Sequence, residues 1–237
     1  MKKAANSKND NSKQPKSDNL KSSYLKNDNP KGVNLKKIRK AMEKAQDPKR
    51  FEHTIGVEYT AAALAMRYDC DIRNAQIAGL LHDCAKCLSD EKRLSICKKN
   101  EILVTELERK NPFLLHAKVG AYLAKKKYGV KDEDILNAIR NHTTGRQGMS
   151  LLEKIVFVAD YIEPCRKHAP NLTEIRKLAF VDLDKALLRI LEDTLSYLRD
   201  SGGDIDPMTE DTWHYLSEES KEAESSGTKG KEKPYGK

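Results

Sequence analysis

His82 and Asp83 stand side by side in the stretch LLHDCAKC, at the end of an apolar run. An imidazole next to a carboxylate offers a nitrogen and an oxygen ligand, a combination that suits divalent ions such as iron, manganese or zinc. The alternative is a hydrogen-bonded cluster at a helix end. The choice between the two depends on which other polar residues converge on this pair.

Four further polar residues lie in or at the ends of apolar helical segments. Asp160, in IVFVADYI, is the most informative, because a buried carboxylate without a partner costs several kcal/mol unless its pKa shifts or a cation pairs with it. A metal ion would supply that cation, so the sequence predicts a metal centre where several helices meet. The other three residues are His53, His116 and His142.

The five cysteines argue for a reducing compartment and against a disulfide framework, since their number is odd and their spacing does not repeat. Cys84 and Cys87 form a C-x-x-C pair, but a structural zinc site would need a second such pair. We therefore interpret both as small residues on a helix.

The elements that must position these residues are helices. Between residues 35 and 216, apolar residues recur at spacings of three and four, and no segment alternates as a strand would. One helix is expected over 72–86, where His82 and Asp83 would point about 100° apart and reach one ion only with help from other helices. The sequence predicts a single all-α domain. Further helices are expected over 34–45, 50–69, 89–100, a segment after Asn111-Pro112 ending near Gly129, 151–164 and 181–203, with a short terminal segment that carries Trp213. The stretch 132–150 is expected to be a helix that runs into a polar turn.

The composition of the two ends of the chain predicts disordered polar tails. Residues 1–34 contain eight lysines and three aspartates and almost nothing that would form a core, and residues 217–237 are similarly poor in apolar side chains. The net charge of +8 is carried in large part by the first tail, which leaves open a weak, salt-sensitive contact with RNA or other polyanions. No membrane-spanning run or secretory signal is found, so a cytoplasmic protein is expected.

The ordered series of motifs RFEHTIGV, AGLLHDCAK, LLHAKVGAY, AIRNHTTG and LEKIVFVADYIEPCR resembles the HD superfamily of metal-dependent phosphohydrolases. More narrowly, it is similar to symmetrical diadenosine tetraphosphate hydrolases of the YqeK type, from about residue 36 to residue 215. The resemblance implies an HD-domain helical bundle over 35–216. It also implies a divalent metal, iron first and manganese or another ion second, held by His53, His82, Asp83 and Asp160.

The resemblance further implies a nucleoside diphosphate beside the metal and a glycine-to-proline segment that closes over it. The segment, GGDIDPM, is the part that matches least well. The implied nucleotide-binding residues are Arg50, His53, Asp83, Lys86, His116, His142, Asp160, Tyr161, Arg166, Gly203, Asp204, Ile205, Asp206, Pro207 and Met208.

The expected reaction is hydrolysis of a dinucleoside tetraphosphate by metal-activated water, with ADP as leaving group and a second ADP as the other product. The expected catalytic residues are His82, Asp83, Lys86, His116 and His142, the last two as proton donors that titrate near physiological pH. Two alternatives stay open: an HD phosphohydrolase acting on another nucleotide, and a non-catalytic module that binds nucleotide or RNA. The sequence also leaves open whether the chain forms a homodimer.

Overall fold

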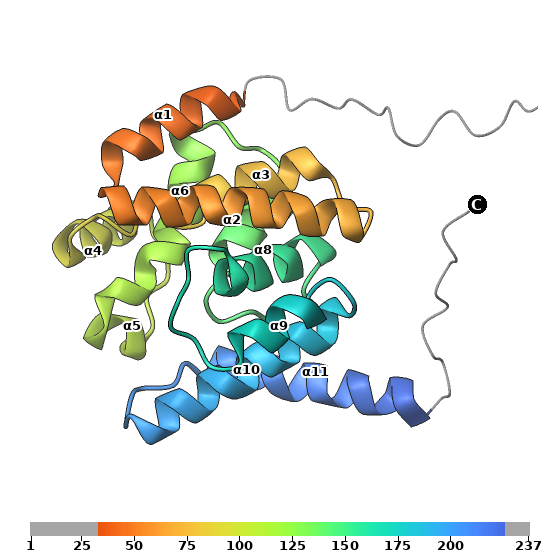
Figure 1. Cartoon of the computed structure of the whole chain (residues 1–237). Coiled ribbons are helices and arrows are strands. Elements are labelled where there is room, and N and C mark those ends of the chain that lie inside the picture. The colour runs from red at the N-terminus through yellow and green to blue at the C-terminus, as the bar shows by residue number, and fades with distance from the viewer. Residues whose placement is uncertain (1–32, 226–237) are drawn as a thin grey trace, which may run out of the picture. The chain divides into compact units, whose positions relative to one another are not determined.

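The computed structural model describes residues 33–225, and every regular element in that range is a helix (Figure 1). The all-α prediction is confirmed. The elements are α1 Leu35–Ala45, α2 Pro48–Arg67, α3 Ile72–Leu81, α4 Asp90–Lys99, α5 Glu106–Lys110, the 3₁₀ helix η1 Pro112–Leu115, α6 His116–Lys126, α7 Glu133–Arg140, α8 Leu151–Ile162, α9 Leu172–Leu178, α10 Leu183–Asp200 and α11 Pro207–Ser225.

The centre of the fold is α2 packed between α3 and α8, with α7 and α10 against α8 (Figure 1). Alanines on α2 and Gly79 on α3 let these helices approach closely, since a Cβ on Gly79 would lie 3.0 Å from the Cα of Glu58. Leu64, Ile77 and Ile155 are fully buried between them. A smaller apolar cluster lies under α4, η1 and α6 and contains Ala85, Cys97, Leu115 and Val119.

The helix predicted over 72–86 is wrong in its last five residues, because α3 ends at Leu81. Residues 82–88 form consecutive turns in which every second amide donates to the carbonyl three residues earlier, as in Cys84 N–H to Leu81 O at 3.1 Å and Lys86 N–H to Asp83 O at 3.0 Å. This tighter winding replaces α-helical geometry at the point where His82 and Asp83 occur. The pair therefore lies at and just beyond a helix end.

The predicted domain limits need two corrections. Val33, which we assigned to the tail, is 5% exposed and packs in the core, and α11 continues to Ser225, beyond the limit at residue 216. Residues 217–225 include four glutamates, one lysine and one alanine, and such good helix formers extend a helix without burying apolar surface. The disorder expected for 1–32 and 226–237 concerns residues outside the described range.

Two short helices, α5 and α9, were not predicted, because five and seven residues are too few for a readable period. None of the helices described in 33–225 combines the length and the apolarity needed to cross a membrane.

Candidate metal centre

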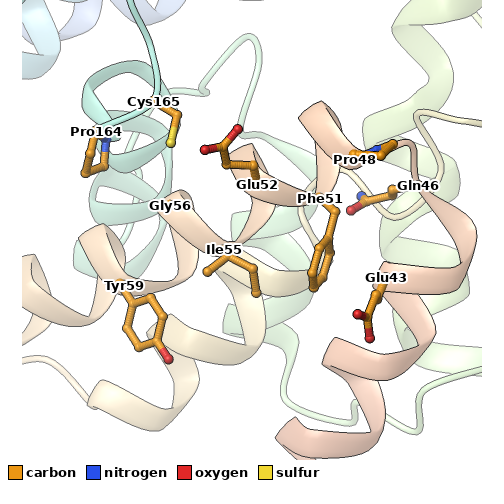
Figure 2. Close-up of a pocket in the computed structure, with 10 residues that line it drawn as sticks. All are labelled: Glu43, Gln46, Pro48, Phe51, Glu52, Ile55, Gly56, Tyr59, Pro164 and Cys165. Atoms are coloured by element: carbon orange, nitrogen blue, oxygen red, sulfur yellow. The ribbon is translucent and has the colours of Figure 1, made fainter.

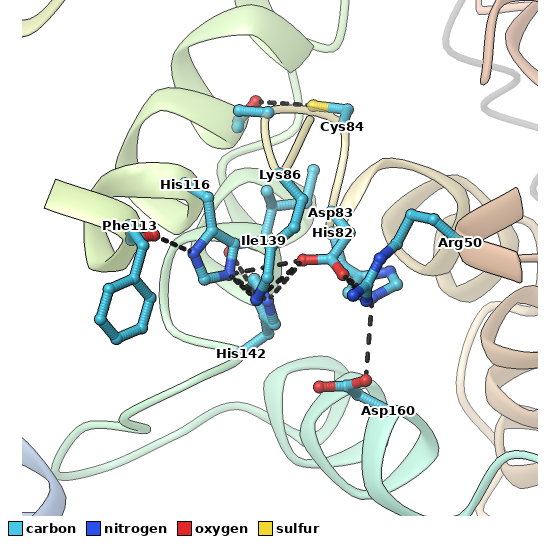
Figure 3. Close-up of polar contacts among 12 residues, drawn as sticks. Arg50, His82, Asp83, Cys84, Lys86, Phe113, His116, Ile139, His142 and Asp160 are labelled. Carbon is cyan, nitrogen blue, oxygen red and sulfur yellow. Dashed lines mark hydrogen bonds and ion pairs between the residues drawn. The ribbon is translucent and has the colours of Figure 1, made fainter. Parts of the chain in front are cut away.

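Six polar residues from five helices and their ends converge on one buried point (Figure 3). Each is brought there by its place in the fold. His53 lies within α2, His82 caps the C-terminus of α3 with Asp83 next to it, His116 begins α6, His142 follows α7, and Asp160 lies near the end of α8.

The four imidazole rings are oriented in the same sense. In three of them Nδ1 lies against the carbonyl oxygen of the residue three positions earlier, an acceptor, so this nitrogen carries the proton and Nε2 is left as a ligand atom. The three pairs are His82 with Gly79 (2.7 Å), His116 with Phe113 (2.6 Å) and His142 with Ile139 (2.7 Å). In the fourth, Nδ1 of His53 lies 3.2 Å from Oε1 of Glu163.

All four Nε2 atoms therefore face inward. Nε2 of His53 lies 3.3 Å from that of His82, and Nε2 of His116 lies 3.2 Å from that of His142. Asp160 closes the side next to His53, with Oδ1 at 3.1 Å from Nε2 of that ring.

Asp83 lies between the two histidine pairs and presents one oxygen to each. Its Oδ2 is 3.5 Å from Nε2 of His82 and 3.9 Å from Nε2 of His53. Its Oδ1 is 3.4 Å from Nε2 of His116 and 3.5 Å from Nε2 of His142. The candidate ligands thus form overlapping sets: His53 with His82 and Asp83, His82 with His142 and Asp160, and Asp83 with His116 and His142.

The fit of a cation to this centre rests on one atom. Oδ1 of Asp83 is buried and accepts no hydrogen bond from the described residues, although two imidazole nitrogens lie near it. A buried acceptor without a donor is costly, and a divalent ion between these nitrogen and oxygen atoms would satisfy it. The residues present therefore fit a divalent metal.

The electrostatics of the centre favour deprotonated ligands. Burial, the neighbouring His142 and Lys86 lower the pKa of His116 to about 3, so this ring is neutral at pH 7. The prediction that His116 titrates near physiological pH is therefore wrong, because this ring is desolvated and lies beside the ammonium of Lys86. Burial alone would raise the pKa of Asp83, but the neighbouring imidazoles of His82 and His142 and the ammonium of Lys86 lower it well below its ordinary value.

Three cations surround the buried centre. Nη1 of Arg50 donates to Oδ2 of Asp83 at 2.8 Å, Nζ of Lys86 lies 3.2 Å from Nε2 of His116, and Nη2 of Arg166 lies 3.0 Å from Oδ1 of Asp160. Each of the three side chains is about one-third exposed, so each can meet a ligand from solvent. A polar pocket of about 380 Å³ opens beside His53 and is lined by Asp47, Lys49, Arg50, His53, Glu163 and Arg166.

The sequence of this chain matches the family model described as "HD domain" over residues 50–165, which include all six converging residues. A Bacillus subtilis (strain 168) protein named "Bis(5'-nucleosyl)-tetraphosphatase, symmetrical" is 45% identical over 167 residues, covering 70% of this chain and 89% of that protein. The chain belongs to this family of HD-domain proteins. A protein of the same name from Halalkalibacterium halodurans is 41% identical and covers 73% of this chain and 91% of its own length.

A solved structure of an HD-domain protein shares the fold of this chain. It is described as a "predicted HD superfamily hydrolase involved in NAD metabolism" from Clostridium acetobutylicum, and it is 44% identical to this chain. The superposition has a TM-score of 0.76 and covers 78% of this chain and 98% of that structure. The resemblance inferred from the motifs is confirmed at the level of family and fold.

Not all residues predicted for the site of this HD domain face the centre. Tyr161 donates its hydroxyl to the carbonyl oxygen of Pro170 at 3.1 Å and to none of the six converging residues. Residues 203–206 lie between α10 and α11, and Pro207 and Met208 begin α11. Asp204 accepts a hydrogen bond at 2.8 Å from Asn111, which precedes the η1 turn that leads to His116. This contact ties the segment to the η1 side of the centre without placing it over the ligands.

Sequence reasoning missed two residues that support the site. Glu163 is buried against His53, and the buried Arg93 donates hydrogen bonds to the carbonyls of the turns that carry Lys86. The sequence pattern did not single them out. Glu163 precedes a proline and so resembles part of a helix stop, and Arg93 has the spacing of a surface residue on a helix.

A second hollow lies outside the centre. The apolar pocket shown in Figure 2 has a volume of about 540 Å³ and lies between α1, α2 and the segment after α8. Its lining shares no residue with the six converging side chains: Glu43, Gln46, Pro48, Phe51, Glu52, Ile55, Gly56, Tyr59, Pro164 and Cys165.

The C-x-x-C pair does not take part in the centre. Cys84 turns its thiol toward the carbonyl of Gly120, and burial raises the pKa of this thiol to about 12, which disfavours the thiolate that a metal requires. Cys87 is exposed.

Proposed function

We propose that this chain hydrolyses diadenosine tetraphosphate and related dinucleoside polyphosphates symmetrically, releasing two ADP. The observation that carries the proposal is the buried carboxylate of Asp83, which presents one oxygen to each of two pairs of imidazole Nε2 atoms. Three partly exposed cations, Arg50, Lys86 and Arg166, lie next to these ligands. The relatives from Bacillus subtilis and Halalkalibacterium halodurans support the substrate class by their names.

His53, His82, Asp83 and Asp160 would hold the first divalent ion, with iron proposed first and manganese second. The set of Asp83, His116 and His142 offers ligands of the same kind on the other side of the shared carboxylate. When bound, such an ion lowers the pKa of coordinated water and offsets negative charge on phosphoryl oxygens.

The chain's own cations would bind the polyphosphate. Arg50 and Arg166 lie on the His53 side and border the polar pocket, whereas Lys86 lies on the His116 side. If the cleaved bond of the substrate lay at Asp83, the phosphates on one side of that bond would contact Arg50 and Arg166, and those on the other side would contact Lys86. Arginine can bind two phosphate oxygens at once, which favours one orientation of the chain of phosphates.

His116 has a role other than proton donation. A neutral imidazole whose Nδ1–H is fixed by Phe113 O can hold or position through Nε2, but it has no proton to give from that atom. The departing ADP oxygen is a phosphate oxygen, and Lys86 is the exposed cation near this side that can stabilise its charge. The segment 203–208, tethered at Asn111, is proposed to cover the nucleotide on this side.

The experiment is a product analysis across a nucleotide panel. Purified protein is incubated with ferrous or manganese ion and diadenosine tetraphosphate, diadenosine triphosphate, deoxynucleoside triphosphates or guanosine tetraphosphate. The proposal expects ADP alone from diadenosine tetraphosphate and slow turnover of the mononucleotides. Preferential turnover of a mononucleotide would favour the alternative HD phosphohydrolase, and metal-free, folded protein after anaerobic purification would favour the binding module.

A further inference from the structure

Nδ1 of His53 faces the side chain of Glu163, whereas Nδ1 of each of the other three histidines faces a backbone carbonyl oxygen. His82 and His142 lie at or just after the C-terminal end of a helix, where carbonyl groups lack amide partners and can accept from Nδ1. His116 follows η1, and the carbonyl of Phe113 there accepts from both the backbone N–H and Nδ1 of His116. His53 lies inside α2, where each carbonyl already accepts from the amide four residues later. Its ring therefore needs an acceptor from another element.

The Glu163 carboxylate is that acceptor, and its two oxygens are both engaged. Oε1 lies 3.2 Å from Nδ1 of His53, and Oε2 accepts from the backbone N–H of Cys165 at 2.6 Å. The residue is 2% exposed, so water competes little for these bonds.

The backbone around Glu163 is fixed from a third helix. Arg176 on α9 donates to the carbonyl oxygens of Ile162 at 2.9 Å, Glu163 at 2.6 Å and Arg166 at 3.0 Å. These bonds hold the turn after α8, so the carboxylate reaches α2 from a rigid support.

The α2 side of this contact depends on Gly56, one turn after His53. A Cβ at this position would lie 2.5 Å from Oε2 of Glu163 and 3.3 Å from its Cδ. The carboxylate thus fills the space that any larger residue would take, and Gly56 also borders the apolar pocket of Figure 2.

We propose that Glu163 is a positioning residue for the metal centre: it accepts the Nδ1 proton of His53 and thereby directs the Nε2 lone pair of that ring toward the ion. This inference rests on the metal-dependent function proposed above. A carboxylate behind a ligating histidine fixes the ring and increases its basicity, and removal of such a partner typically weakens metal affinity about 10- to 100-fold.

The test is the dissociation constant for Mn²⁺, measured by equilibrium dialysis of the full chain, alongside urea denaturation of the metal-free protein. Glu163→Ala is expected to weaken Mn²⁺ binding about 10- to 100-fold. Glu163→Gln is expected to recover part of that loss, because its amide oxygen can accept from His53 while its amide nitrogen cannot accept from Cys165. Gly56→Ala leaves Glu163 in place but displaces its carboxylate, and should weaken binding in the same direction.

The matched control is Glu153→Gln on α8, the helix whose C-terminus Glu163 caps. Glu153 is also buried, but it pairs with Arg146 and caps the start of α8, far along the helix from Asp160. This variant should lose stability and keep the wild-type dissociation constant. The inference is overturned if Glu163→Ala and Gly56→Ala bind Mn²⁺ as wild type does, or if affinity follows unfolding stability across all four variants. Wild-type protein that binds neither Mn²⁺ nor Fe²⁺ would overturn the proposed function itself.

Discussion

The guanidinium of Arg50 lies 2.8 Å from Oδ2 of Asp83, the oxygen that faces His53 and His82. Arg50 is about one-third exposed and borders the polar pocket, whereas Asp83 is almost fully buried. One side chain therefore touches both the shared carboxylate of the centre and the space open to a polyphosphate. A cation bound at Oδ2 would compete with this ion pair and leave the guanidinium available to phosphate oxygens.

Replacing Arg50 should impair substrate binding more than metal binding. We expect Arg50→Ala to raise KM for diadenosine tetraphosphate about 10- to 100-fold, the cost of one or two charge-assisted hydrogen bonds. Arg50→Lys should recover less than half of this loss in free energy, since an ammonium cannot bind two oxygens in one plane. Steady-state kinetics with saturating metal provide the measurement, and an unchanged KM in Arg50→Ala would exclude the phosphate contact.

Replacing Asp83 should remove the metal and the activity together, because this carboxylate belongs to both ligand sets. Asp83→Asn is expected to lose bound metal on anaerobic purification and about 10³-fold or more of kcat/KM. Asp71→Asn, a carboxylate-to-amide change at the N-cap of α3, is the control and should keep both, since asparagine also caps well. Full metal content in Asp83→Asn, measured by elemental analysis, would refute the assignment.

The helical fold and the converging residues were accessible from sequence for the same reason: a His or Asp is conspicuous among apolar residues that repeat at helical spacing. His53, His82, Asp83 and Asp160 were selected in this way, and the structure brings them together. What sequence did not give was the local geometry. The turns after Leu81 depend on backbone bonds to residues three back, which an apolar pattern does not encode.

Supporting residues were harder to see because their roles exist only in three dimensions. Arg93 has the spacing of a surface arginine, yet it is buried against carbonyls from two other segments. Glu163 precedes a proline and was interpreted only as part of a helix stop, although it reaches a histidine 110 positions earlier. The short helix α9 was not predicted because it is shorter than two full helical turns, which is too few residues to show a helical period.

The metal-free protein should lose stability in acid through Asp83 and Asp160. For Asp160, burial would raise the pKa, but the hydrogen bond from His53 and the charges of His82 and Arg166 lower it far below its ordinary value, and Asp83 is lowered too. A lowered folded-state pKa means that the unfolded chain takes up protons first, so this stability is present above about pH 5 and is lost as the pH falls through 4.

The measurement is the urea midpoint of chelator-treated protein at a series of pH values between about 6 and 3. Asp160→Asn should show a shallower decline than wild type, because one of the two lowered carboxyl groups is gone. Parallel curves for the two proteins would contradict the assignment.

Arg93 should matter for stability rather than for chemistry. It is 6% exposed and donates to the carbonyls of Ala85, Lys86, Leu88 and Pro112, which join the turns after α3 to η1. We expect Arg93→Ala to lower the free energy of unfolding by about 3 kcal/mol, because several buried acceptors lose their donor. The exposed Arg109 is the control, and Arg109→Ala should change it by less than about 0.5 kcal/mol in the same urea denaturation. Equal effects would show that the buried contacts are not stabilising.

The most direct measurement is the fate of labelled oxygen when the metal-loaded protein cleaves diadenosine tetraphosphate in ¹⁸O-water. Attack of water at a β-phosphorus predicts ADP as the sole nucleotide product, with one ¹⁸O in the β-phosphate of one ADP from each pair and none in any α-phosphate. Mass spectrometry distinguishes these species. Formation of AMP and ATP, or label in an α-phosphate, would contradict symmetrical hydrolysis at this centre.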